Sequence, residues 1–164
     1  MPVRRQPASQ QAEDYPQDYT GQVVIAADAA LGARWWRCWN AQGVTAPLPF
    51  VIGDLPEIVE EETDGQPVAV QVSLPVTTNG RIFPREDADV WTFDAAAGQS
   101  VTCAVTAREL GSPLAARLEV RDPAGKVLAE STGDSLAEAR ARFVAPAAGR
   151  YTARISHVGA GGLQ

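Results

Sequence analysis

Apolar and polar residues alternate along much of the chain in short runs. The run from Ser100 to Arg108 is the clearest example. A period of two residues indicates a β-strand that buries one face and exposes the other to solvent. We expect the buried face to carry Val101, Cys103 and Val105, and the solvated face to carry Thr102, Ala104 and Thr106.

Runs of this kind recur at regular spacing through the second part of the chain, and each is bounded by Gly, Pro or Asp. The predicted strands are Val68 to Leu74, Thr78 to Phe83, Asp89 to Phe93, Ser100 to Arg108, Ala115 to Arg121, Val127 to Glu130, Ala141 to Val144 and Tyr151 to Ser156. About eight short strands separated by turn residues are typical of a sandwich. We therefore predict an all-β fold, a jelly-roll-like antiparallel β-sandwich with Trp91 and Phe93 in its core. Ser135 to Arg142 has helical propensity, and there we expect an irregular loop or one helical turn.

The first part of the chain has a weaker pattern. Met1 to Thr20 is polar and lacks apolar periodicity, so it is predicted to be a flexible lead-in. Short apolar runs then occur at Val23 to Ala27, Arg34 to Asn40 and Leu48 to Ile52, which indicates a small, partial β unit. A proline and several acidic residues follow, as is typical of a linker. The predicted organisation is a lead-in at 1–20, a partial β unit at 21–55, an acidic linker at 56–66 and a β-sandwich at 67–164.

Composition argues against several classes of function. The 164 residues are 45% hydrophobic, enough for a core, and carry 14 Lys and Arg against 20 Asp and Glu, a net charge of -6. Nucleic acid is not an expected partner, because phosphate binding needs clustered cations. No run approaches the roughly 20 apolar residues of a membrane span. The N-terminal residues lack the apolar middle of a signal peptide, so we expect any export signal to lie on sequence outside this chain.

Residues that could carry catalysis are scarce. His157 is the only histidine, and neither a nucleophile elbow nor a phosphate-binding glycine loop is present. We expect His157 to be a surface residue and the chain not to be an enzyme. The two cysteines, Cys38 and Cys103, lie on different predicted units and are expected to remain unbridged.

Three tryptophans occur close together, at positions 35, 36 and 39. On one continuous strand, Trp35 and Trp39 would share a face with Arg37, and Trp36 would point to the other face. Such residues either pack in a core or against a neighbouring domain, or they present an aromatic surface to sugar or peptide. The sequence leaves both roles open.

Several motifs occur in an order known from one bacterial family. They are EEETD at residues 60–64, VTTNGRI at 76–82, EDADVWTF at 86–93, AGQ at 97–99, LGSPL at 110–114, DPAGKVLA at 122–129 and PAAGRY at 146–151. From about Glu60 to His157 the chain resembles the bacterial pre-peptidase C-terminal (PPC) domain. The stretch from Gly43 to Glu57 is similar to the end of an immunoglobulin-like module of the IPT/TIG type, so residues 21–55 would be the tail of such a module.

The resemblance implies a β-sandwich from an exported bacterial protein, extracellular or periplasmic, that does not hydrolyse a substrate. Collagenase relatives in this family bind calcium and collagen, with calcium between an acidic entry segment and an acidic turn before the aromatic strand. Carried over by position, the implied calcium ligands are Glu60, Glu62 and Asp64 at the entry and Glu86, Asp87 and Asp89 at the turn. Thr63 stands where the family usually has Pro, and Asp64-Gly65 where it has Asn followed by Asn or Asp. Acidic clusters suit calcium, which takes roughly 6 to 8 oxygen ligands, but a run of like charge is also typical of a solvated linker.

Three functions are compatible with these features. The first is an accessory module for adhesion, substrate targeting or spacing within a larger exported protein, with neighbouring domains and an extracellular protein or polysaccharide as partners. The second is a structural spacer without a ligand, and the third, less favoured, is a fragment of a secreted peptidase. Family members usually continue past a glycine-rich turn, here residues 159–162, into another strand. We therefore also expect the sandwich to lack its last strand and to expose an edge.

Overall fold

The computed structural model describes residues 22–60, 68–83, 87–134 and 137–158, and the chain divides into two compact units, residues 1–30 and 31–164. In the first unit, the described residues 22–30 contain a turn in which the Ala29 N–H donates to the Ala26 carbonyl at 3.0 Å, and no strand. The strand predicted at Val23 to Ala27 is therefore wrong. Val23 and Val24 are largely exposed, because no described strand pairs with this run and buries it.

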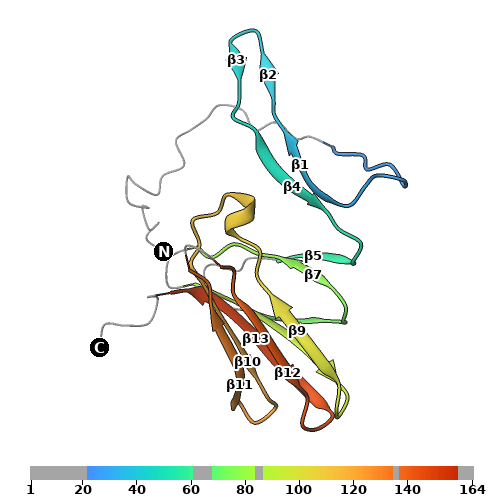
Figure 1. Cartoon of the computed structure of the whole chain (residues 1–164), viewed down its shortest axis with the longest axis vertical. Coiled ribbons are helices and arrows are strands. Elements are labelled where there is room, and N and C mark those ends of the chain that lie inside the picture. Colours follow the sequence, from blue (N-terminus) through green and yellow to red (C-terminus); the bar gives the residue numbers. More distant parts are fainter. Residues whose placement is uncertain (1–21, 61–67, 84–86, 135–136, 159–164) are drawn as a thin grey trace, which may run out of the picture. The chain divides into compact units, whose positions relative to one another are not determined.

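Two short antiparallel ribbons open the second unit (Figure 1). Strand β1 (Gly32–Trp36) pairs with β4 (Leu48–Ile52), and β2 (Trp39–Asn40) pairs with β3 (Gly43–Val44). The run predicted from Arg34 to Asn40 is thus interrupted between Trp36 and Trp39. Two hydrogen bonds between Cys38 and Thr45 fix the backbone at this interruption. The Thr45 N–H donates to the Cys38 carbonyl at 2.9 Å, and the Thr45 hydroxyl accepts from the Cys38 N–H at 3.1 Å.

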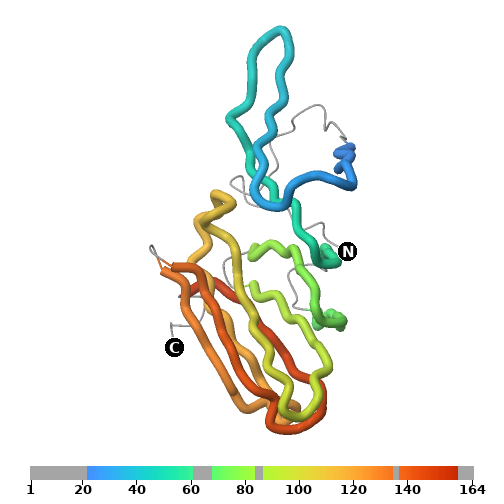
Figure 2. Tube along the Cα trace, turned by 45° about the vertical axis from the view of Figure 1, so that its right-hand side comes forward, coloured from blue at the N-terminus to red at the C-terminus, as the bar shows by residue number. Residues whose placement is uncertain are grey.

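The rest of the unit is a β-sandwich, which confirms the predicted fold class. One layer is a five-stranded sheet with the order β11-β10-β13-β8-β6. Its strands are β6 (Ala69–Val72), β8 (Ala88–Ala95), β10 (Ala116–Arg121), β11 (Val127–Thr132) and β13 (Gly149–His157). The remaining strands form two pairs, β12 (Arg140–Val144) with β9 (Ser100–Ala104) and β5 (Glu57–Val59) with β7 (Thr77–Asn79). Figure 2 follows the chain through these strands.

The core lies between the five-stranded sheet and the β9–β12 pair. Phe93 and Tyr151 come from the sheet and Phe143 from β12, and their ring centroids lie 5.4–6.3 Å apart. Tyr151 is completely buried, and its hydroxyl donates to the Ala147 carbonyl at 2.6 Å. Trp91 and Phe93 are 4% and 2% exposed, as predicted for core residues. Burial also alternates along β9 as predicted, with the Thr102 side exposed.

Two strand pairs are parallel, a feature that the alternation pattern did not predict. They are β5 with β7 and β6 with β8. Strand β5 falls within the segment predicted to be an acidic linker. It is a strand because Ile58 packs against the hydrophobic core while Glu57 and Val59 point to solvent. Residues 57–59 are therefore part of the sandwich and not of a linker.

Strand β9 ends earlier than predicted, and a 3-10 helix, η1 (Arg108–Leu110), follows it. A carboxylate oxygen of Glu138 accepts the backbone N–H groups of Ala107, Arg108 and Glu109 at 2.9, 2.8 and 3.2 Å. Burial alone would raise the pKa of Glu138, but these three donors outweigh it and lower the pKa. Residues 137–139 are irregular, as expected for part of the 135–142 loop, and β12 begins directly after them.

Candidate metal centre

The end of β5 and the end of β7 meet at the candidate site. Because these strands are parallel and Val59 pairs with Asn79, the next residues, Glu60 and Gly80, leave the sheet side by side. The Glu60 N–H donates to the Asn79 carbonyl at 2.8 Å. At the other end of β5, the Asn79 side-chain amide donates to the Glu57 carboxylate at 3.3 Å. These contacts fix the Glu60 backbone beside Gly80.

Asp89 approaches the same place from β8. It extends by one position the core-facing row of Trp91, Phe93 and Ala95, and it is only 6% exposed. A carboxylate on the core side of a strand is costly unless charge or hydrogen bonds compensate it. Among the predicted ligands that the structure describes, Asp89 is the most deeply buried.

The carboxylates of Glu60 and Asp89 converge on Gly80. A β-carbon placed on Gly80 would lie 2.2 Å from Asp89 Oδ2 and 2.8 Å from Glu60 Oε2. The Glu60 Oε2 atom is buried and accepts no hydrogen bond from any residue in the described ranges. Both carboxylates thus reach into the space that a side chain on Gly80 would fill, and the Glu60 oxygen there accepts no hydrogen bond from a described residue.

The other predicted ligands are not brought to this point by the described structure. Asp87 accepts the Phe83 N–H at 3.1 Å and the Ala88 N–H at 2.7 Å, so its carboxylate organises the turn before β8. Glu62, Asp64 and Glu86 lie outside the described residues. Within the described ranges, no three or more His, Cys, Asp or Glu side chains lie close enough together to hold a metal ion.

The sequence pattern does not indicate that Gly80 is part of a site. Gly80 lies within the strand predicted from Thr78 to Phe83, and its place in the site depends on its missing side chain. A single position cannot reveal which distant carboxylates approach it. The parallel pairing of β5 and β7, also unpredicted, is what brings Glu60 there.

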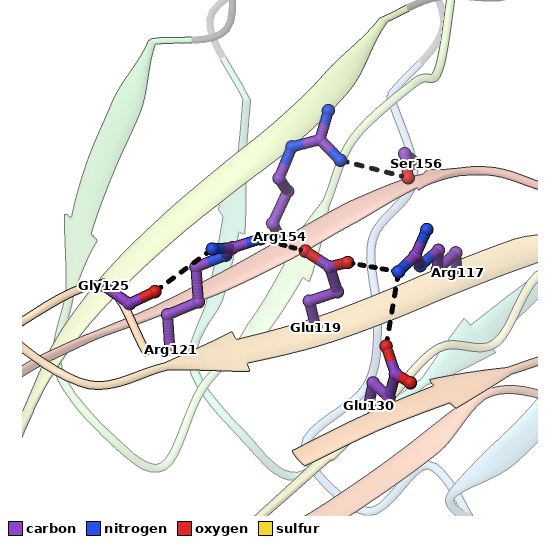
Figure 3. A network of polar contacts seen from close by, with 7 residues as sticks. All are labelled: Arg117, Glu119, Arg121, Gly125, Glu130, Arg154 and Ser156. Carbon is purple, nitrogen blue, oxygen red and sulfur yellow. Dashed lines mark hydrogen bonds and ion pairs between the residues drawn. The ribbon is translucent and has the colours of Figure 1, made fainter. Parts of the chain in front are cut away.

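A second polar cluster lies on the outer face of the five-stranded sheet (Figure 3). Glu119 is 6% exposed, and its two oxygens bind Arg117 at 2.7 Å and Arg121 at 2.8 Å. The hydrogen bond from Arg121 holds the pKa of Glu119 below its usual value despite burial, and the charges of Arg117 and Arg154 lower it further. Further contacts join Arg117 to Glu130, Arg121 to the Gly125 carbonyl and Arg154 to Ser156. The arginines offset the buried charge of Glu119, so the cluster is a stabilising network of the sheet.

The remaining candidates are simple to place. Cys38 and Cys103 are both free thiols, as predicted, and burial raises the pKa of Cys103. His157 ends β13, and its ring contacts the Val158 carbonyl.

The three tryptophans at 35, 36 and 39 are 65%, 46% and 79% exposed, so in the described structure they are not core residues. None of the described elements is a helix of the length and hydrophobicity needed to cross a bilayer.

These features define an all-β protein whose sandwich brings the buried Asp89 and the partly buried Glu60 close together at one end. Residues 87–157 match the family model of the bacterial pre-peptidase C-terminal domain. The match confirms the resemblance over that stretch. Members of this family are non-catalytic domains, often found in secreted bacterial proteins. A search of curated proteins found no match. The entry segment from Glu60 and the immunoglobulin-like module at 21–55 lie outside the matched residues and stay predictions.

Proposed function

We propose that this chain is a non-catalytic accessory module of an exported bacterial protein and that calcium stabilises its sandwich. Glu60 and Asp89 would hold the ion beside Gly80. Glu62, Asp64 and Glu86, which the resemblance also selects, are the candidates for further ligands. The observation that carries this proposal is the convergence of two carboxylates on one glycine.

The chemistry of the pair fits a hard cation. Two like charges held close together repel each other unless a cation offsets them. A calcium ion removes this repulsion and accepts oxygen ligands with flexible geometry. The buried Glu60 oxygen that accepts no hydrogen bond from the described residues is available as such a ligand.

Calcium at this point would link two parts of the chain. Glu60 lies at the entry to the sandwich and Asp89 lies in its central sheet. An ion bound by both would hold the entry segment on the sandwich and so fix the direction in which the preceding residues leave it. This favours a function as a calcium-dependent connector between neighbouring domains of an extracellular or periplasmic protein.

The test is thermal unfolding of the whole chain in calcium and in chelator. Binding to the folded state alone adds about 2.7 kcal/mol at a hundredfold excess over Kd, which raises Tm by roughly 10 °C in a domain of this size. Asp89→Asn should remove this shift. Asp94→Asn, on the same strand but exposed and paired with Arg150, should retain it. Equal Tm in both solutions would contradict the proposal.

Adhesion or substrate targeting requires a ligand, whereas spacing does not. An array of collagen-like peptides and polysaccharides, probed with the calcium-loaded chain, separates these two functions. Retention of one ligand class favours targeting, and no retention favours a connector. Hydrolysis of a generic peptide by pure protein would instead support the peptidase alternative.

A further inference from the structure

Strand β9 is an edge strand of its layer. It pairs with β12 on one side, and none of the described strands pairs with it on the other. Sheet edges are usually protected by a charged residue, a proline or a bulge. Strand β9 has the sequence SVTCA, and its register with β12 runs without a shift. The edge of β9 that faces away from β12 therefore lacks the usual protection.

The hydrogen bonds to β12 fix which backbone groups point to this edge. The Val105 N–H donates to the Ala139 carbonyl, and the Ala145 N–H donates to the Gln99 carbonyl, both at 2.9 Å. Both pairs continue the β9–β12 register, in which hydrogen-bonded pairs alternate with pairs that are not hydrogen-bonded. The residues whose N–H and C=O groups point away from β12 are thus Ser100, Thr102 and Ala104.

These backbone groups are open to a further strand. In the part of the chain that the structure describes, no hydrogen bond reaches them. The side chains of the three residues are exposed, and Cys103, on the inner side of the same strand, is only half-buried. An extended peptide laid antiparallel to β9 can therefore exchange backbone hydrogen bonds with all three residues, as in other cases of strand addition.

The outer face of the β9–β12 pair carries only positive charge. Its side chains are those of Ser100, Thr102, Ala104, Arg140, Arg142 and Val144. Arg142 donates through Nε to the Ser100 hydroxyl at 3.3 Å, and neither arginine forms an ion pair with a described residue. The carboxylate of Glu138, two residues before Arg140, already accepts three backbone N–H groups. In a chain with a net charge of -6, this face favours an acidic partner.

We propose that the β9 edge binds an extended peptide in which acidic and apolar residues alternate. Side chains of residues opposite each other in neighbouring strands lie on the same face of a sheet. Peptide residues opposite Ala104 and Thr102 would therefore lie on the outer face, in line with Arg140 and Arg142. The outer Cα atoms of such a three-strand row are about 10 Å apart. Only the small Ala104 and Thr102 side chains stand between, so a glutamate can reach each guanidinium.

The remaining positions of the peptide follow from the same register. Residues opposite Val101 and Cys103 would lie on the inner side of the layer and should be apolar. The row through Ser100 ends in Val144, so a neutral residue suits that position. The matched sequence, from its N-terminus, is Glu-Val-Glu-Val-Thr, with the first glutamate opposite Ala104 and the threonine opposite Ser100.

Fluorescence anisotropy with the whole chain tests the strand addition. The probe is a labelled, end-capped peptide with this sequence between Gly-Ser flanks. Methyl groups on the two glutamate nitrogens remove donors that face β9 and should weaken binding by at least about tenfold. Methyl groups on the two valine nitrogens point away from β9 and should leave the Kd unchanged. Because the change is made in the peptide, the folding of the chain is not altered.

A peptide with lysine in place of both glutamates tests the charge preference. It should bind to the wild type several-fold more weakly than the glutamate peptide. Arg142→Glu should shift the preference toward the lysine peptide. Lys126→Glu makes the same change in net charge at an exposed residue between β10 and β11 and should leave the preference unchanged.

Three results overturn the proposal. The first is the absence of saturable binding of the glutamate peptide. The second is an equal Kd for the two methylated peptides, or for the glutamate and lysine peptides. The third comes from sedimentation of the chain alone and with peptide, since dimerisation that the glutamate peptide does not reverse would assign the β9 edge to a second copy.

Discussion

Glu60 and Asp89 place carboxylate oxygens 2.8 and 2.2 Å from the point where a side chain on Gly80 would begin. The two acids are 29 positions apart in sequence and come from different strand pairs. Their approach depends on the parallel pairing of β5 with β7, which places Glu60 beside Gly80. The site is therefore a product of the topology and not of a local motif.

Gly80→Ala should abolish the calcium effect. The added methyl group would overlap Asp89 Oδ2 and crowd Glu60 Oε2, so the two carboxylates would have to separate. We expect Tm in calcium to fall to the value in chelator. Gly53→Ala is the matched control, because its β-carbon would meet only the Glu57 side chain at 3.4 Å, an ordinary contact. A full calcium shift in Gly80→Ala would show that the ion binds elsewhere.

Glu119→Gln should destabilise the sandwich at neutral pH by about 1–3 kcal/mol, since it weakens two charge-assisted hydrogen bonds. The folded-state pKa of Glu119 is lowered. Its contribution to stability is thus complete above the unfolded pKa and is lost as pH falls through the folded pKa. Urea unfolding at several pH values should show the difference between wild type and variant shrinking below about pH 4. A difference that does not change with pH would assign the effect to packing.

Glu138→Ala should loosen the turn at η1. The change leaves the N–H groups of Ala107, Arg108 and Glu109 without their shared acceptor, at a cost of about 1–3 kcal/mol. Hydrogen exchange at these amides should accelerate more than exchange in β10. Glu138→Gln keeps an acceptor oxygen and should have a smaller effect, and Glu109→Gln, an exposed residue of η1, should have none. Unchanged exchange in Glu138→Ala would contradict this function of the carboxylate.

Phe143→Ala and Tyr151→Phe separate the packing of the aromatic core from its hydrogen bond. Phe143 contacts both Phe93 and Tyr151, so its truncation should cost about 3–5 kcal/mol. Tyr151→Phe removes only the hydrogen bond to the Ala147 carbonyl and should cost about 1 kcal/mol. Denaturant midpoints measure both values. Similar losses in the two variants would mean that the hydrogen bond contributes as much as the ring packing.

The strand pattern predicted most of the sandwich, because alternation directly reports which side chains are buried. It located β8 and β13 within a few residues and assigned Trp91 and Phe93 to the core. It could not predict the parallel partner of β5, since pairing direction depends on contacts between residues distant in sequence. The acidic composition of residues 57–64 hid a strand whose one core contact is Ile58.

The candidate site was predicted in part. The resemblance selected Glu60 and Asp89, which converge, and Asp87, which instead accepts two backbone N–H groups of its own turn. Spacing alone cannot distinguish a carboxylate that closes a turn from one that faces another acid. Gly80 became part of the site only through three-dimensional proximity.

Isothermal titration of calcium into the metal-free chain tests the central claim most directly. One calcium ion per chain should bind to the wild type, and Asp89→Asn should lose this binding while Asp94→Asn keeps it. Magnesium should bind more weakly, because it demands a stricter octahedral geometry than calcium. Absence of saturable calcium binding to the wild type, or equal binding to Asp89→Asn, would contradict the account.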